Sequence, residues 1–300
     1  ILNRISDVYL TYYDLVQQQQ VMASIDSAIV ISNQRVTTAD NRFSIGKASK
    51  LELLNAKVDL NTDKSLLLSQ QELYKNTKIR LNELLARDLQ IDFKVVDTII
   101  FDENLTYDEL KDLANKQNPQ LQAQILNKKL ADLNLKEIKG NRYPTVRLTS
   151  GYNFTRSEAS LGFITQSSGQ GFVYGVSASV PLFNGFLQSK REKAAQFEVE
   201  NATFILSQQK LALESQMASF YQSYQTNLDL IKVESENVEI AKQNLDITLA
   251  KFKIGTITTI EVRTAQQNFI EASVRYANSQ YKTKLSEINL KELAGTLSLN

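Results

Sequence analysis

The chain of 300 residues contains no cysteine and no histidine. Without cysteine there is no disulfide framework and no thiol nucleophile, and without histidine there is no imidazole base. Zinc-finger and haem-type ligation are excluded for the same reason. Charged side chains could still catalyse a reaction, but no clustered set of them stands out in the sequence. We therefore expect no enzyme, no metal site and no bound cofactor.

Glycine and proline are scarce, with 10 and 3 residues respectively. Such a composition predicts long uninterrupted elements joined by few turns. The stretch 186–252 contains neither residue, and as one unbroken helix it would be about 100 Å long at the usual rise per residue. The sequence also lacks an apolar run of about 18 residues, the length that a transmembrane helix requires.

The charges of the two signs nearly cancel, since 34 basic and 33 acidic residues give a net charge of +1. They are interleaved along the chain, which is not the electrostatic footprint of a nucleic-acid-binding protein. We interpret the basic cluster of Lys190, Arg191 and Lys193 as a solvated helix face. The sequence therefore predicts no nucleic-acid partner.

An internal duplication relates the two halves of the chain. The stretch "RFSIGKASKLELLNAK" at 42–57 returns as "KFKIGTITTIEVRTAQ" at 251–266, an offset of 209 positions. The same offset matches Leu81 with Leu290. The second copy begins near Asn118, so about ninety residues of the first copy would precede residue 1. Because the chain opens inside a periodic segment without a signal peptide, we expect an N-terminally truncated sequence.

Apolar residues recur every seven positions in both copies. One row in the second copy is Tyr224, Ile231, Val238, Leu245 and Phe252, and its counterpart in the first copy is Leu15, Met22, Ile29, Val36 and Phe43. A further row, Val233, Ile240, Ile247 and Ile254, lies two residues on, nearly on the opposite side of the helix. A helix with two such rows needs two neighbours, which distinguishes a closed wall of helices from a simple two-stranded coiled coil with its single seam. From this pattern alone we favour a solid helical bundle, and the closed wall of helices is the alternative.

Gly46 and Gly255 each follow one periodic segment and precede another, the pattern of a glycine that ends a helix. We therefore predict an antiparallel hairpin of helices 1–43 and 49–87 and another of helices 186–252 and 259–294. The expected division of the chain is as follows: 1–91, helical hairpin of the first repeat; 92–118, a strand and a short helix; 119–142, first helix of the second repeat; 143–185, a β-hairpin; 186–300, long helical hairpin of the second repeat.

The stretches 143–155 and 172–182 alternate between apolar and polar residues. Each is about as long as a tilted strand that crosses a bilayer. A soluble hairpin with one wet face remains the alternative. In lipid an isolated hairpin would leave the backbone groups of its edges unpaired, so several copies would have to contribute strands to one closed sheet.

Several short stretches, taken in order, carry a family resemblance: Phe–x–Ile–Gly at both turns, "NPQLQA", "RYPTVRLTSGY", "VPLFNG" and "KELAGTL". Over nearly the whole chain this order resembles the TolC-type outer membrane factors. The resemblance implies a mainly helical homotrimer whose long helical hairpins, coiled-coil in character, form an α-barrel in the periplasm. Its amphipathic strands would contribute to a 12-stranded β-barrel in the outer membrane of a Gram-negative bacterium, in contact with outer membrane lipid.

The implied function is a channel-tunnel, the passive exit duct of a tripartite efflux pump or a type I secretion system. Its partners would be a periplasmic adaptor protein and an inner-membrane transporter. A periplasmic or soluble coiled-coil scaffold without a pore, similar to an adaptor, is the alternative. It accounts for the heptads and the turns but not for strands of bilayer length.

The resemblance also implies roles for particular residues. The hairpin tips would contact the adaptor through Ile45, Gly46, Ile254 and Gly255. Six residues past each turn glycine, Glu52 and Glu261 match acidic positions that line the pore aperture, although aspartate is commoner there.

In a trimer these two positions would place six carboxylates around one pore. Such a ring favours cations, and crowding of like charges raises proton affinity. Ile257 stands where some members have an arginine that helps to hold the channel shut. Arg263 is the nearest basic substitute.

Overall fold

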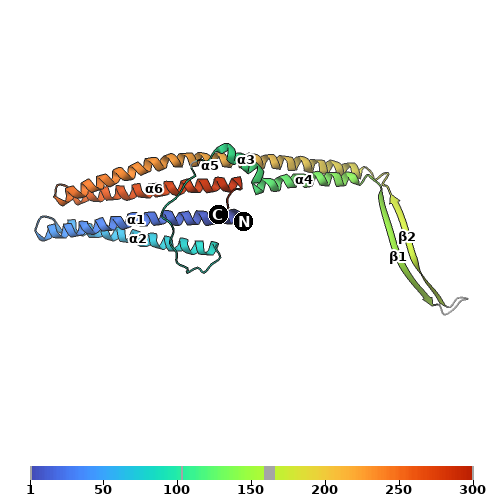
Figure 1. The fold of residues 1–300 in the computed structure, drawn as a ribbon, viewed down its shortest axis with the longest axis horizontal. Helices are drawn as coiled ribbons and strands as arrows, with labels where there is room; N and C mark the ends of the chain where they lie inside the picture. The colour runs from blue at the N-terminus through green and yellow to red at the C-terminus, as the bar shows by residue number, and fades with distance from the viewer. Residues whose placement is uncertain (1, 103, 159–165, 299–300) are drawn as a thin grey trace. The chain divides into compact units, whose positions relative to one another are not determined.

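The computed structural model describes residues 2–102, 104–158 and 166–298 (Figure 1). Its elements are α1 (Leu2–Ser44), α2 (Lys50–Leu84), α3 (Tyr107–Gln117), α4 (Pro119–Gly140), β1 (Thr145–Glu158), β2 (Gln166–Ser179), α5 (Leu187–Lys253) and α6 (Thr259–Ala294). The chain is mostly helical and carries a small antiparallel sheet, as the sequence predicts. It divides into two compact units, Ile1–Pro119 with Ala212–Asn300, and Gln120–Leu211.

In the first unit, α1 and α5 end at turns of the same geometry. Gly46 has a φ of +75° and Gly255 a φ of +80°. The backbone N–H of Lys47 donates to the carbonyl of Arg42 at 2.8 Å, and the corresponding bond in the second turn measures 3.1 Å. This bond, from the residue after the glycine back to the last helical turn, defines a Schellman motif. The duplicated glycines are thus explained by a left-handed backbone that other residues adopt only with strain.

Helix α1 packs between α2 on one side and α6 on the other. Leu15 and Val16 are fully buried in a cluster with Leu81 of α2. Further along α1, Val21 and Ile25 pack against Ala277 of α6. Helix α1 thus has two neighbours within the chain. The prediction of two neighbours rests on the two rows of α5, and for that helix it stays a prediction.

Arg275 of α6 pairs with Glu234 of α5 at 3.1 Å, so the helices α2, α1, α6 and α5 follow one another in that order within this unit (Figure 1). The predicted inner row of α5 is buried at Tyr224, Leu245 and Phe252. Its second row, Val233, Ile240, Ile247 and Ile254, is between 54% and 76% exposed. On α2, at the other end of the series, Leu51, Leu54, Val58 and Leu68 are likewise exposed. Within the described part of the chain, nothing covers these two apolar rows.

The sequence predicts a strand within 92–118. For the residues that the structure describes there, this prediction is wrong. Residues 92–102 form neither a helix nor a strand, and the short helix α3 follows at Tyr107–Gln117. Val95 and Ile99 are buried against α1 and α2. The side-chain amide of Asn82 in α2 donates to the carbonyls of Leu89 and Ile91, in the loop that leads to this segment. Side-chain contacts with the two helices therefore hold this segment in place, without hydrogen bonds to any strand that the structure describes.

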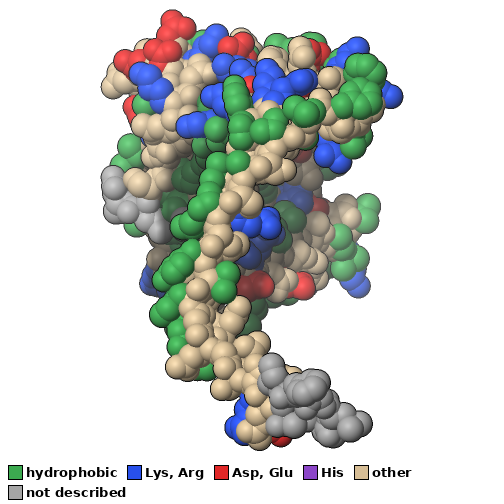
Figure 2. All heavy atoms as spheres, turned by 90° about the vertical axis from the view of Figure 1, so that its right-hand side faces the viewer, with side chains coloured by type: hydrophobic (Ala, Val, Ile, Leu, Met, Phe, Trp, Pro, Cys, Tyr) green, Lys and Arg blue, Asp and Glu red, His purple; other side chains and the backbone are tan. Residues whose placement is uncertain are grey.

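In the second unit, β1 and β2 form an antiparallel hairpin with Thr145 opposite Ser179 and Glu158 opposite Gln166. The second strand was expected to reach residue 182 but ends at Ser179, just before Pro181, whose nitrogen cannot donate to a ladder. One face is apolar and between 41% and 77% exposed, formed by Val146, Leu148, Tyr152, Phe154, Phe172, Tyr174 and Val176. Figure 2 shows these green side chains along one side of the hairpin.

Helix α4 and the first part of α5 run antiparallel in this unit. Asn134 donates to Glu198 at 3.4 Å, and Gln188 donates to the carbonyl of Ile138 at 2.5 Å. Of the helices in the described ranges, none has a stretch both long and apolar enough to cross a membrane.

Candidate functional site at the hairpin tips

Both helical turns lie at the same end of the first unit (Figure 1). A cavity of about 450 Å³ lies between them and is lined by residues of both turns. Glu52 and Glu261 both line it, together with Arg42 and Gly255. The structure thus brings the two predicted aperture residues to one cavity, although they are 209 positions apart in sequence.

Glu261 forms a capping box at the start of α6. The backbone N–H of Thr258 donates to its carboxylate at 2.7 Å, and the N–H of Glu261 donates to the Thr258 hydroxyl at 3.4 Å. The backbone N–H of Thr258, and then its hydroxyl, hold the pKa of Glu261 below the usual value. Within the single chain this shift is opposite in sign to the rise expected for a crowded carboxylate ring, because hydrogen bonding stabilises the ionised form.

Glu52 occupies the equivalent place in α2 but has a different partner. Its backbone N–H donates to the Ser49 hydroxyl at 3.2 Å, which caps the helix. Its carboxylate lies 3.4 Å from the guanidinium of Arg42, which also lies 5.7 Å from the ring centre of Phe252. Arg42 therefore connects the first turn to the end of α5. The two glutamates are equivalent in the repeat but not in their electrostatic environment.

The tips themselves are apolar and exposed. Ile45 and Ile254 are 66% and 76% exposed. A Cβ atom placed on Gly46 or Gly255 would meet no other atom within 4 Å. The requirement for glycine is therefore conformational, since an L-residue forced into the left-handed region loses about 1–2 kcal/mol.

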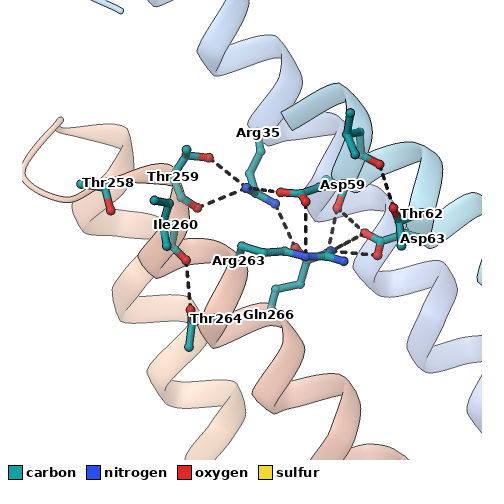
Figure 3. Close-up of polar contacts among 12 residues, drawn as sticks. Arg35, Asp59, Thr62, Asp63, Thr258, Thr259, Ile260, Arg263, Thr264 and Gln266 are labelled. Atoms are coloured by element: carbon teal, nitrogen blue, oxygen red, sulfur yellow. Dashed lines mark hydrogen bonds and ion pairs between the residues drawn. The ribbon is translucent and has the colours of Figure 1, made fainter. Parts of the chain in front are cut away.

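A polar cluster of Arg35, Asp59, Asp63, Arg263 and Gln266 lies behind the tips (Figure 3). Arg35, Asp63 and Gln266 are buried, whereas Asp59 and Arg263 are partly exposed. Arg35 of α1 donates to Asp59 of α2 at 2.9 Å and to the hydroxyl and carbonyl of Thr259 in α6 at 2.9 and 3.2 Å. One buried guanidinium therefore bridges three helices.

Asp63 is the acceptor at the centre of this cluster, with only 3% of its surface exposed. Arg263 approaches both of its oxygens, at 2.8 and 2.9 Å. The Ser32 hydroxyl donates to it at 2.5 Å and the Gln266 amide at 3.2 Å. Both contacts come from one nitrogen, Nη1, and charge-assisted hydrogen bonds of this kind are stronger than those between neutral groups. Arg263 thus links the second hairpin to the first.

Sequence reasoning named Arg263 only as a substitute and missed Arg35, Asp59, Asp63 and Gln266. These residues could have been found from the positions at which the two copies of the repeat differ in charge. At the offset of 209, Arg35 corresponds to Asn244, Asp59 to Asn268 and Asp63 to Ala272. Charged residues that occur in one copy and have uncharged counterparts in the other indicate an interaction that only one copy makes.

Replacing Asp63 with alanine should lower the free energy of unfolding by about 3 kcal/mol, because the buried donors Ser32 and Gln266 would lose their charged acceptor and Arg263 its closest carboxylate. Denaturant titration measures this change. Lys64→Ala, at the exposed neighbouring position, is the control and should change stability by about 0.5 kcal/mol or less. The double variant Asp63→Leu with Arg263→Met should recover part of the loss. Equal stability of Asp63→Ala and Lys64→Ala would contradict this role for the cluster.

The chain is similar to known proteins along most of its length. A family model described as "Outer membrane efflux protein" matches residues 110–296. Outer membrane protein TolC of Vibrio cholerae is 22% identical, over 96% of this chain and 66% of that protein. Outer membrane protein TolC of Escherichia coli is 20% identical, over 96% of this chain and 60% of that protein. The chain thus spans less than two thirds of the length of these relatives.

The crystal structure of the outer membrane protein VceC from Vibrio cholerae shares the fold. It superposes with a TM-score of 0.83 at 16% identity, covering 98% of this chain and 70% of that chain. At this identity the likeness concerns the fold alone.

Proposed function

Because the chain belongs to the outer membrane efflux protein family, we propose that it forms part of an outer-membrane channel, the passive exit duct of a tripartite efflux pump or a type I secretion system. The family consists of channels and not of enzymes. The observation that carries the proposal is the pair of uncovered apolar rows on α2 and α5. Helices that present apolar rows at both ends of an open series are suited to ring closure.

Closure of the ring requires further copies of the chain. If α2 of one copy packs against α5 of the next, each contact is the same and a rotation closes the ring. We infer a homotrimer, the assembly that the family resemblance implies. Each copy would then bury Val58 and its neighbours on α2 against Ile240 and Ile247 on α5.

The β-hairpin supports the membrane part of the proposal. Its apolar face is exposed from Val146 to Phe154 on β1 and from Phe172 to Val176 on β2, and lipid is the medium that such a face requires. Its two free edges would have to pair with strands of other copies, since lipid leaves no partner for unpaired backbone groups. We propose that these strands contribute to the 12-stranded barrel of the family. A coiled-coil scaffold without a pore would leave this apolar face in water.

A glutamate in the outer row of α5 should prevent assembly. Ile240→Glu would bury an unpaired charge at each contact between copies and weaken it by about 3 kcal/mol. Multi-angle light scattering of the full-length protein in detergent measures the fraction of trimer. Ser235→Glu adds the same charge to the same helix outside the row and should leave the trimer intact. A trimer that tolerates Ile240→Glu as well as Ser235→Glu would argue against this interface.

We propose that Glu52 and Glu261 set the ion preference of the aperture. Exchange of both for glutamine removes six carboxylates from a trimer and keeps nearly the same side-chain size. Glutamine can still accept the capping bond of Thr258, so α6 should stay formed. The preference for cations in planar bilayers should fall, and block by multivalent cations should weaken.

Thr258→Ala is the control for this experiment, because it breaks the capping box and keeps both charges. Selectivity in that variant should match the parent. If the double glutamine variant also matches the parent, the two residues serve only as local helix caps and ion-pair partners.

We also propose that the tips, Ile45, Gly46, Ile254 and Gly255, are the docking site for a periplasmic adaptor that connects the duct to an inner-membrane transporter. Their exposure and the common geometry of the two turns support this assignment. Valine at both Gly46 and Gly255 would strain each left-handed position by about 1–2 kcal/mol.

In this double valine variant, site-specific crosslinking to the adaptor should weaken while the trimer persists. Lys47→Val places the same side chain at the next position of the first turn and should have a smaller effect. Crosslinking and export at the parental level in the double variant would remove the tips from the docking assignment.

A further inference from the structure

A patch of positive charge lies at the helical end of the β-hairpin, within the unit Gln120–Leu211. It is formed by the end of α4, the start of α5 and the residues next to them, and all of its basic side chains are exposed: Lys136, Lys139, Arg142, Lys190, Arg191 and Lys193. Figure 2 shows Lys and Arg side chains in blue gathered at this end of the hairpin. We call these six residues the basic patch.

Acidic residues neutralise only part of the basic patch. Arg142 pairs with Glu192 at 2.5 Å and also approaches its second oxygen at 3.1 Å. Glu137 is the other acidic residue in the stretches 136–142 and 187–193. The remaining basic residues therefore give this surface a local excess of positive charge, although the whole chain is nearly neutral. The net charge of the whole chain does not reveal such a local surface.

Exposed aromatic and aliphatic residues lie between the basic patch and the strands. Tyr143 precedes β1, while Leu182, Phe183 and Phe186 follow β2, and Leu182 is 94% exposed. The rings of Phe183 and Phe186 meet edge to face with their centres 5.6 Å apart. Each connection thus passes from basic residues through large apolar side chains to the apolar face of the hairpin.

This order of side chains matches the polarity of one half of a membrane. Apolar strand faces suit the hydrocarbon, aromatic rings suit the interface, and basic residues next to it are attracted to anionic headgroups. Nucleic acid is a poorer match, because the excess charge is confined to a surface that borders an apolar face.

We propose that the basic patch binds the phosphate groups of anionic phospholipids in the leaflet on the helical side of the hairpin. This inference rests on the proposed function, in which the hairpin spans a membrane. Lysine suits the contact because its ammonium group meets a phosphate as a point charge without demanding one orientation. The patch would fix the depth of the protein and favour anionic over zwitterionic lipid around it.

Native mass spectrometry of the full-length protein in detergent tests this proposal, with phosphatidylglycerol and phosphatidylethanolamine as the two added lipids. The parent should retain more phosphatidylglycerol. The variant Lys136→Gln, Lys139→Gln, Lys190→Gln, Lys193→Gln should lose this preference by about ten-fold or more, since each basic residue adds to the attraction. Raised salt should weaken retention by the parent.

The control removes four exposed lysines elsewhere, Lys57→Gln, Lys64→Gln, Lys210→Gln and Lys242→Gln, and should retain phosphatidylglycerol like the parent. Equal loss in both variants would show a general effect of net charge and overturn the proposal. So would equal retention of the two lipids by the parent, or a patch that binds the soluble polyanion heparin but not phosphatidylglycerol. Bilayer conductance, measured separately, tests the channel itself: a parent that does not conduct contradicts the proposed function.

Discussion

A helix that carries apolar side chains on two opposite sides can bury both only between two neighbours. Helix α1 meets this requirement inside the chain, because it packs between α2 and α6. Helices α2 and α5 do not, and each keeps an exposed apolar row. The proposed ring follows from this geometric demand. The β-hairpin has a similar requirement, because the apolar face formed by residues such as Val146 and Phe154 is exposed.

The two matched turns are the result of the sequence duplication. The hairpins are connected to each other by residues that differ between the two copies. Arg35, Asp63 and Arg263 have no charged counterparts in the other copy. In the structure they join α1 and α2 to α6 behind the tips. Because a buried ion pair is costly to break, this cluster holds the two turns close together. The glutamates at the tips therefore face one cavity.

The long helices and the turn glycines could be predicted because heptad spacing and a positive-φ glycine are local signals. Strand alternation at Val146 and Leu148 is equally local. The extended segment at Val95 could not be assigned correctly, since a strand depends on a partner far away in sequence. The polar cluster was missed because Asp63 becomes buried only where three helices meet. The capping role of Glu261 was a readable signal, as the Thr–x–x–Glu pattern is present in the sequence.

Contact between α2 of one copy and α5 of the next is the central claim of this account. These 300 residues contain no cysteine, so a pair of engineered cysteines meets no competing thiol among them, and the parent protein oxidised in parallel gives the background. Val58 and Ile247 lie on the exposed rows at similar distances from their turns. In the full-length protein, Val58→Cys combined with Ile247→Cys should form disulfides between copies and give a covalent trimer on a non-reducing gel. Monomers alone, with both thiols free under oxidation, would contradict the account.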